Sequence, residues 1–248
     1  MSTVTFKSFL AESDDRQMSF DDMIEIIKRD CKPWLDVVKN LPRGKRMIYR
    51  GMSTASTASL NKKSVRTNRE PRHSDKWLHD FLNNFLFKKF GTKYRSEALF
   101  VTPSTTVAKG YAHKRGETFD TGEVYLIFPI GAVDYCFSET TKDVTWDIMA
   151  NIMPELNYDY SREGLKGDKI TRAIKADIEE MIEKNERFHY VENENIGSAF
   201  KRDSEIMIKC KDFYFIMLHS AAGTPKISQT SEPEDSRYVY DFEDKLFA

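Results

Sequence analysis

The chain has 248 residues, of which 40% are hydrophobic and 31% charged, and its formal net charge is −1 at pH 7. It is long enough to bury a substantial core, and its balanced charge argues against binding nucleic acid by bulk electrostatics alone. No apolar run approaches the roughly 20 residues that a membrane-spanning helix needs, so we expect no membrane partner. The beginning MSTVTFKSFLAES is too short and too polar for a secretory signal. Neither the cysteines nor the histidines have the spacing of a metal site.

Helix and strand signals alternate with polar segments in the first ninety or so residues. Residues 1–18 form a short targeting or flexible segment, after which Ser19 has the position of a helix N-cap followed by acidic residues. The stretch RMIYRGMS predicts a strand that ends at Gly51, and the polar residues 53–73 predict a long loop. Apolar residues at helical spacing in DKWLHDFLNNFLFKKFG predict a helix that is closed by Gly91.

Short stretches rich in β-branched and aromatic residues predict strands in the rest of the chain. These stretches are ALFVT, GEVYLIFPIG, DYCFS, SEIMIKC and DFYFIMLHS. The last two predict a hairpin around Lys211 and Asp212. Helices are predicted for TTVAKGYAHK and for an insertion at about 139–187, where DKITRAIKADIEEMIEKNERF has one apolar face. Residues 222–248 form a polar C-terminal tail, whose final YVYDFEDKLF could dock on the body of the protein.

This order of elements predicts an α+β fold over residues 19–221. Strands and helices are mixed without a regular βαβ alternation, which argues against a doubly wound sheet. No Walker loop and no GxGxxG motif stands between a strand and a helix, so the usual phosphate-binding loops are absent from the sequence.

Three predicted strand ends carry side chains that suit one reaction centre. IYRG places Arg50 at the first, LFVTPSTT places Thr102 and Ser104 at the second, and FKRDSEIMI places Glu205 at the third. Cleavage of a nicotinamide glycosidic bond has an oxocarbenium-like transition state, which a carboxylate can orient and stabilise. The pyrophosphate of the dinucleotide suits the forked donors of arginine, and a small hydroxyl residue can hold the carboxylate in place.

The order of these motifs resembles that of the mono-ADP-ribosyltransferases of the Arg–Ser–Glu type, which occur among bacterial toxins and phage enzymes. In that family the first strand carries an NAD-binding Arg followed by Gly, as Arg50 and Gly51 are here. The second strand carries Ser-Thr-Ser and leads into a helix with an alanine and an aromatic residue, which TPSTTVAKGY resembles. The last motif is an aromatic residue, two residues, Glu or Gln, one residue and the catalytic Glu. Phe200, Asp203 and Glu205 have these places.

The resemblance covers about residues 47–217 and implies both a fold and an activity. The implied fold is an ADP-ribosyltransferase-like core of two short, orthogonally packed β-sheets with flanking helices. NAD is the implied substrate, no metal is needed, and the acceptor of ADP-ribose is a host protein. Arg50 and Gly51 are implied to bind NAD. Glu205 is implied to orient the nicotinamide ribose and to stabilise the oxocarbenium ion.

Two motifs depart from the family pattern. The middle motif reads VTPS instead of Ser-Thr-Ser, so either Thr102 or Ser104 is the hydroxyl residue that positions Glu205 at the NAD site. Asp203 replaces the Glu or Gln that helps to choose the acceptor in the family. We expect Asp203 to act beside the catalytic acid and, with Phe200, to contact the acceptor. Its retained carboxylate favours an arginine acceptor.

The basic segment 62–95 offers further candidates for phosphate binding. Its RTNREPRHS stretch contains Arg69 and Arg72, which could clamp the NAD phosphates or contact an acidic target, and we expect Arg72 to bind NAD. A solvated loop is the alternative interpretation. The same segment is the hint for a rival function, an ADP-ribosyltransferase that acts on nucleic acid. A second rival is a catalytically degenerate member of the fold that acts as a binding or virion protein.

The N-terminus has a second, independent resemblance. MSTVTFKSFLAE is similar to the capsid-targeting peptides of large T-even-type phages, which end at a prohead-protease site, and the cut here would follow Glu12. This resemblance implies packaging in the phage head, injection with the DNA, and action in the cytoplasm of the bacterial host. A plain amphipathic N-terminal helix is the alternative.

Overall fold

The computed structural model describes residues 18–52, 60–71, 76–112, 123–152, 172–184, 188–218 and 234–248. Its helices are α2 (Phe20–Asp30), α3 (Lys32–Val38), α4 (Lys76–Phe90), α5 (Tyr94–Glu97), α6 (Thr105–Ala112), α7 (Val144–Asp147), the π-helix η1 (Ile148–Ile152), α10 (Arg172–Glu183), α11 (Ile196–Arg202) and α12 (Glu234–Phe247). Its strands are β1 (Tyr49–Met52), β2 (Asn61–Ser64), β3 (Leu99–Val101), β4 (Glu123–Ile130), β5 (Asp134–Ser138), β6 (Tyr190–Glu192), β7 (Ile206–Lys209) and β8 (Asp212–Met217).

The described fold is a mixed α+β structure with two small antiparallel sheets, which confirms the predicted class at that level. One four-stranded sheet has the order β1-β4-β8-β2 and the other the order β3-β7-β5-β6. Orthogonal packing of the sheets and the likeness to ADP-ribosyltransferases remain predictions. The N-terminal segment with Glu12, and also Arg72, lie outside the described residues.

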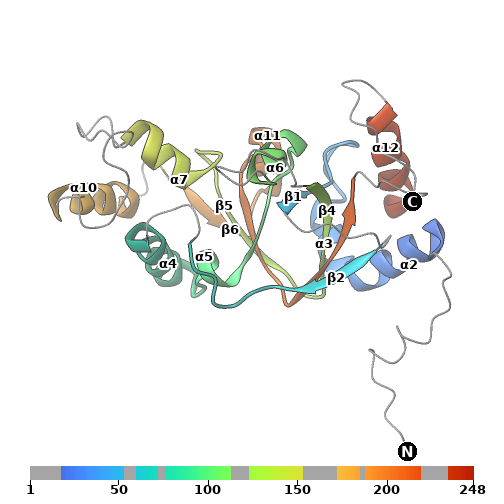
Figure 1. The fold of residues 1–248 in the computed structure, drawn as a ribbon, viewed down its shortest axis with the longest axis horizontal. Coiled ribbons are helices and arrows are strands. Elements are labelled where there is room, and N and C mark those ends of the chain that lie inside the picture. Colours follow the sequence, from blue (N-terminus) through green and yellow to red (C-terminus); the bar gives the residue numbers. More distant parts are fainter. Residues whose placement is uncertain are drawn as a thin grey trace, which may run out of the picture.

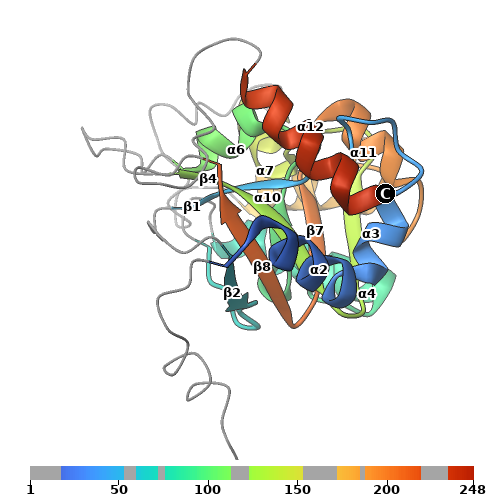
Figure 2. The same ribbon diagram turned by 90° about the vertical axis from the view of Figure 1, so that its right-hand side faces the viewer.

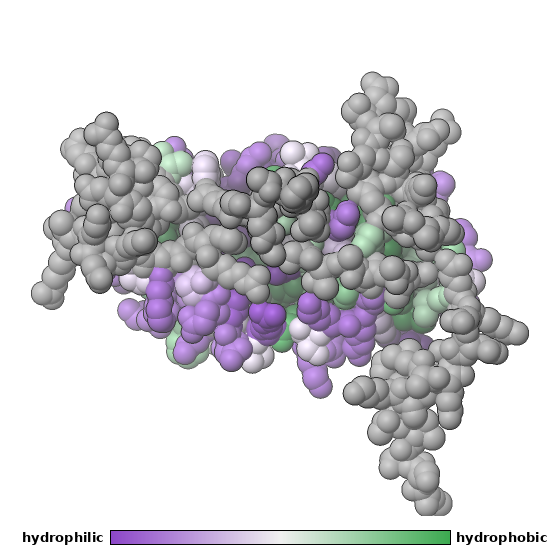
Figure 3. All heavy atoms as spheres, viewed as in Figure 1, coloured by the Kyte–Doolittle hydropathy of each residue, from purple (hydrophilic) through white to green (hydrophobic). Residues whose placement is uncertain are grey.

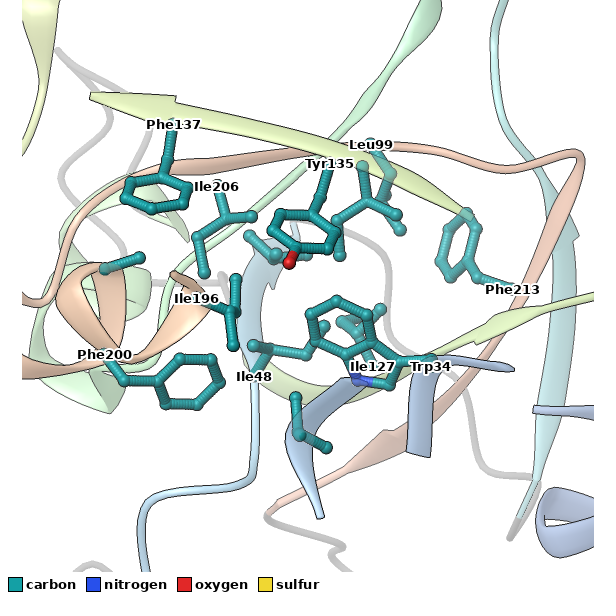
Figure 4. Close-up of a cluster of buried hydrophobic side chains, with 14 of the residues drawn as sticks. Trp34, Ile48, Leu99, Ile127, Tyr135, Phe137, Ile196, Phe200, Ile206 and Phe213 are labelled. Atoms are coloured by element: carbon teal, nitrogen blue, oxygen red, sulfur yellow. The ribbon is translucent and has the colours of Figure 1, made fainter. Parts of the chain in front are cut away.

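The two sheets face each other across a shared hydrophobic core, and helices cover their outer faces. Leu99 and Ile206 of one sheet lie in the same buried cluster as Ile127 and Phe213 of the other, and Figure 4 shows this cluster with Trp34 of α3 packed beneath Tyr135. In Figure 1 the helices α4 and α10 lie at one end of the molecule and α2 and α12 at the other, with the sheets between them.

Many strands have continuous apolar sequences because successive side chains face two different buried clusters. In β7, Ile206 and Ile208 face the shared core, whereas Met207 packs with the helices on the outer side of the same sheet. In β4, Ile127 faces the shared core. Leu126 points to the other face of the sheet, where it lies in the buried cluster that includes residues of α2 and α12. Strands with successive side chains on opposite faces must be apolar throughout when both faces are covered.

The predicted hairpin around Lys211 and Asp212 is wrong. β7 pairs with β3 and β5, whereas β8 pairs with β4 and β2, so the two consecutive strands belong to different sheets. The short connection turns the chain from one sheet to the other. As a result, Ile206 and Phe213 belong to one buried cluster but to different sheets.

Other predicted boundaries also need correction. The expected loop 53–73 contains the edge strand β2, whose Lys62 and Lys63 are exposed and whose partner is β8. No element was predicted for the segments that form β6 and α11, and Lys201 and Arg202 belong to the last turn of α11. The Ser19 N-cap is confirmed, because its Oγ accepts a 3.1 Å hydrogen bond from the Asp22 N–H.

The C-terminal segment carries a helix that docks on the body of the protein. Phe242 and Leu246 of α12 are buried in the cluster that also contains α2 residues, and Figure 2 shows α12 lying beside α2. The ring of Phe242 packs edge-on against Phe20 at 5.5 Å between centroids. Hydrophilic residues dominate the coloured atoms on the face seen in Figure 3. Within the described parts of the chain, no helix is long and apolar enough to cross a membrane.

Candidate functional site

The site forms where the edge strands of the two sheets meet. Tyr49 of β1 and Thr102, which directly follows β3, form an isolated antiparallel bridge. β3 in turn pairs with β7, with Val101 opposite Ile206. Thr102 and Glu205 each adjoin this pair in the sequence, and the Thr102 Oγ1 donates to the carbonyl oxygen of Asp203 at 3.3 Å. The structure therefore brings together the three strand ends that the sequence analysis selected.

Arg50 and Gly51 lie on β1 at this junction. The Arg50 Nη1 donates a 2.6 Å hydrogen bond to the carbonyl oxygen of Phe100, which ties the side chain to the neighbouring strand β3. A Cβ atom on Gly51 would lie 2.1 Å from the Ala108 carbonyl oxygen and 2.5 Å from the Ala112 nitrogen. Gly51 is thus the residue that lets helix α6 approach β1 closely.

Glu205 is a largely buried carboxylate whose side chain is only 15% exposed. Its Oε1 accepts a 3.0 Å hydrogen bond from Nη1 of Arg95, and its own N–H donates to the Lys142 carbonyl at 2.7 Å. Burial, followed by the negative charge of Asp143, raises the pKa of Glu205 to about 7. Positive charges act against that rise in pKa, with the largest effect from Arg95 and smaller ones from Arg69 and Arg50.

The two hydroxyl candidates make main-chain contacts in this structure. Thr102 is 1% exposed, and its Oγ1 donates to the carbonyl of Asp203 at 3.3 Å. The Ser104 N–H donates to the Thr102 Oγ1, and the Ser104 Oγ accepts from the Val107 N–H at the start of α6. Thr102 therefore fixes the chain just before Glu205, and Ser104 acts as a helix cap.

The two expected acceptor residues differ in accessibility. Asp203 ends α11 with a positive φ of 57°, and its side chain is 38% exposed with one oxygen 4.0 Å from the Lys142 Nζ. Phe200 is 3% exposed and belongs to the core between the sheets, as Figure 4 shows. The expectation that Phe200 contacts an acceptor is therefore corrected, because its ring fills the core and does not reach the surface.

Two arginines outside the predicted motifs border the same carboxylate. Arg95 of α5 and Arg69 stack over the ring of Phe100, with guanidinium carbons 4.9 and 4.2 Å from the ring centroid. The Nη2 of Arg95 also donates to Thr145 Oγ1 at 3.2 Å. Arg69 was a candidate in the sequence analysis, whereas Arg95 was missed because no motif surrounds it.

Asp143 is a second missed residue of the site. Its Oδ2 accepts a 2.6 Å hydrogen bond from the hydroxyl of Tyr111, and its Oδ1 accepts from the Trp146 N–H at 3.0 Å. Tyr111 as a whole is 48% exposed, but partial burial of its hydroxyl and the negative charges of Glu205 and Asp143 raise its pKa. The hydroxyl therefore keeps the proton that it donates. The position of the aromatic residue in TPSTTVAKGY was the available sequence signal for this pair.

The site places arginine side chains around the carboxylate of Glu205. Over the described ranges, no group of three or more His, Cys, Asp or Glu side chains could hold a metal ion. Clustered arginines suit phosphate groups, and a carboxylate with a pKa near neutrality can interact with a hydroxyl or a developing positive charge. No protein-family model, curated protein or solved structure matches the chain.

Proposed function

We propose that this protein is an NAD-dependent mono-ADP-ribosyltransferase that modifies a protein of a bacterial host, at an arginine, during phage infection. The observation that carries the proposal is the meeting of Arg50, Thr102 and Glu205 at the junction of two antiparallel sheets. These residues were selected from sequence motifs, and they come from widely separated parts of the chain.

The proposed reaction uses Glu205 as its electrostatic centre. The bond between C1′ of the ribose and the nicotinamide nitrogen breaks, and its electron pair leaves with nicotinamide. The ionised Glu205 orients the ribose and stabilises the positive charge that develops on it. An acceptor nitrogen then forms the new bond to C1′ and releases its proton to water. Arg50 binds the phosphates or ribose of NAD, with Arg69 as a second cation beside it.

Asp203 is the proposed contact for the acceptor. It lies two residues before Glu205 and its side chain is 38% exposed, so a guanidinium group can reach it from solvent. A carboxylate and a guanidinium group form a strong charge-assisted pair. The host location and delivery with the phage head rest on the resemblance of the N-terminus to capsid-targeting peptides.

The proposal is tested by incubating bacterial lysate with labelled NAD and the purified protein. Wild-type protein should label a discrete protein, and Glu205→Gln should abolish labelling while leaving NAD affinity largely intact. Glu25→Gln on the exposed side of α2 is the matched control and should label normally. Mass spectrometry of the labelled product then identifies the acceptor residue, and undiminished labelling by Glu205→Gln would refute the catalytic assignment.

The same experiment separates the rival functions. A label that is removed by nuclease and not by protease would replace the protein acceptor with nucleic acid. The degenerate alternative is supported by the contacts of Thr102, which holds the main chain and not the carboxylate. For such a protein, lysate labelling would be absent. A thermal-shift assay with NAD distinguishes a binding protein from one without an NAD site, because a bound ligand raises the unfolding temperature.

A further inference from the structure

Arg95 and Glu205 form an ion pair that is mostly shielded from water. The side chain of Arg95 is 10% exposed and that of Glu205 15% exposed, and their Nη1 and Oε1 atoms lie 3.0 Å apart. The two residues are 110 positions apart in the sequence. Surface ion pairs contribute little because water and salt screen them, whereas a buried pair interacts strongly and is costly to break on one side.

Contacts on several sides fix the direction of the Arg95 guanidinium. Its Nη2 donates to Thr145 Oγ1 at 3.2 Å, and its guanidinium carbon lies 4.9 Å from the centroid of the Phe100 ring. Phe100 belongs to β3, which pairs with β7, and β7 begins directly after Glu205. An arginine stays protonated in proteins and presents a rigid planar fork, so Arg95 is a fixed positive charge with a defined geometry.

The hydroxyl residues of the middle motif, Thr102 and Ser104, do not hold the carboxylate of Glu205. Thr102 donates to the Asp203 carbonyl, and Ser104 caps α6. The carboxylate of Glu205 is instead held by Arg95. The departure of the middle motif from Ser-Thr-Ser therefore coincides with a different support for the carboxylate.

We propose that Arg95 is a positioning residue that holds the carboxylate of Glu205 ionised and in place for the reaction. A role of Arg95 in catalysis rests on the proposed function, whereas the ion pair between Arg95 and Glu205 is a property of the folded protein. Glu205 can serve a cationic transition state only as the carboxylate, so a group that favours the ionised form acts on the fraction of active protein.

Several charged or titratable groups act on Glu205 or respond to its charge. They come from different elements and are Arg50 of β1, Arg69 after β2, Arg95 of α5, Tyr111 of α6, Asp143 before α7 and Tyr190 of β6. Asp143 raises the pKa of Glu205 and the three arginines lower it. Of these arginines, Arg95 has the largest effect, so its removal should move the titration of Glu205 toward higher pH.

The first test follows the titration of Glu205 directly, by carbon-13 NMR of side-chain carboxylates, with Glu205→Gln used to assign the signal. Arg95→Gln should move the midpoint upward by roughly one pH unit. Arg95→Lys keeps the charge and should restore most of the wild-type midpoint. Arg29→Gln, which removes an exposed arginine of α2 paired with Asp30, is the matched control. An unchanged midpoint in Arg95→Gln would overturn the proposal.

A measurement on the unaltered protein covers the case in which Arg95→Gln does not fold. The guanidinium nitrogen-15 signals of Arg95 should titrate with the same midpoint as Glu205, because the two groups share a hydrogen bond. Arginine signals that stay constant through that midpoint would show that the pair does not exist in solution, which also overturns the proposal.

The second test measures whether the ion pair between Arg95 and Glu205 affects the rate of ADP-ribose transfer. With labelled NAD and lysate, Arg95→Gln should lower the turnover rate at pH 7 by about tenfold or more, with a smaller change in the KM for NAD. Raising the pH should recover part of the rate, and Arg95→Lys should recover more. If wild-type protein labels nothing while the NMR shift is found, the proposed function fails and the hold on Glu205 stands. An equal rate in wild type and Arg95→Gln at pH 7 would remove the catalytic role from Arg95.

Discussion

Tyr49 and Thr102 exchange two main-chain hydrogen bonds, of 2.7 and 2.9 Å, although they extend strands of different sheets. This contact joins the edge of one sheet to the edge of the other. Arg50 follows Tyr49 directly, and Glu205 directly precedes β7, the strand that pairs with β3. The relative position of these side chains is therefore set by backbone pairing, which is more rigid than a loop would be.

Gly51 should be intolerant of even one added methyl group. In Gly51→Ala the new Cβ would lie 2.1 Å from the Ala108 carbonyl oxygen and 2.5 Å from the Ala112 nitrogen. Both atoms belong to the backbone of α6, so the helix itself would have to move. We expect a loss of about 2 kcal/mol or more in the free energy of unfolding, in line with overpacking of other cores, measured by urea denaturation.

A second glycine on the same helix supplies the matched control. Gly110 lies in α6 and has no atom within 4 Å of an added Cβ. Gly110→Ala should be neutral or stabilise the protein by about 0.5–1 kcal/mol, because alanine has the higher helix propensity. Equal stability of Gly51→Ala and wild type would contradict the close packing of β1 and α6.

Glu205 should make the stability of the protein depend on pH. Its pKa is raised in the folded protein from 4.5 to about 7, so between these values the folded state binds a proton that the unfolded state has released. Stability should therefore fall as the pH rises through this window. Glu205→Gln removes the titrating group, so its stability should fall less than that of wild type between pH 4 and pH 8, by on the order of 3 kcal/mol.

Urea denaturation at several pH values checks this prediction. Glu25→Gln, at an exposed position of α2, should follow the wild-type curve at every pH. If Glu205→Gln gains nothing over wild type between pH 4 and pH 8, then the carboxylate is not destabilised by burial in the folded protein.

The strand ends of the site could be predicted from sequence because each has a local signal. Arg50 and Glu205 stand next to apolar runs, and the spacing from Phe200 to Glu205 is contained within a few residues. The mixed α+β class followed from the same local patterns. What local patterns do not contain is the pairing of strands: β7 and β8 are consecutive and apolar, yet each completes a different sheet.

Elements and residues with weak local sequence signals were not predicted. β2 is a short edge strand of Asn, Lys, Lys and Ser that pairs with β8, and it has no apolar alternation. Arg95 lies in a single helical turn, and an arginine there looks like any exposed basic residue until burial is known. Asp143 likewise gains its meaning from Tyr111 and Glu205, which come from distant parts of the chain.

The docking of α12 should contribute substantially to stability. Phe242 is fully buried and its ring packs against those of Phe20 and Phe128, at 5.5 and 5.7 Å between centroids. Phe242→Ala should lower the free energy of unfolding by about 3–5 kcal/mol. Asp241→Ala, at the exposed neighbouring position, should cost little. A small effect of Phe242→Ala in thermal and urea denaturation would show that α12 does not belong to the cooperative core.

Processing of the N-terminus tests the targeting hypothesis separately from the activity. If the segment is a capsid-targeting peptide, protein isolated from phage particles should begin at Ser13, after cleavage behind Glu12. Substitution of Glu12 by alanine should block the cut and leave the longer chain in infected cells. N-terminal sequencing that finds Met1 or Ser2 in protein from virions would refute the hypothesis without affecting the proposed reaction.

The pair of Asp143 and Tyr111 should tune the pH at which transfer begins. With the pKa of Glu205 at about 7, activity that needs the carboxylate should decline below neutral pH, which is high for a glutamate. Asp143→Asn removes the negative charge that raises this pKa. Its amide oxygen can still accept from the Trp146 N–H, and its NH2 group can donate to the hydroxyl oxygen of Tyr111 in place of the bond that Asp143 accepts. The acidic limb of kcat/KM for NAD should therefore move to lower pH.

Tyr111→Phe separates the charge of Asp143 from its hydrogen bond. This variant removes the hydroxyl that donates to Asp143 and retains the carboxylate charge, so the acidic limb should stay near neutral pH or move upward. Arg95→Gln should move it upward as well, because there a favourable positive charge is lost. Opposite directions for Asp143→Asn and Arg95→Gln would identify Glu205 as the group whose ionisation limits the rate, and a limb that moves in neither variant would assign the limit to another group.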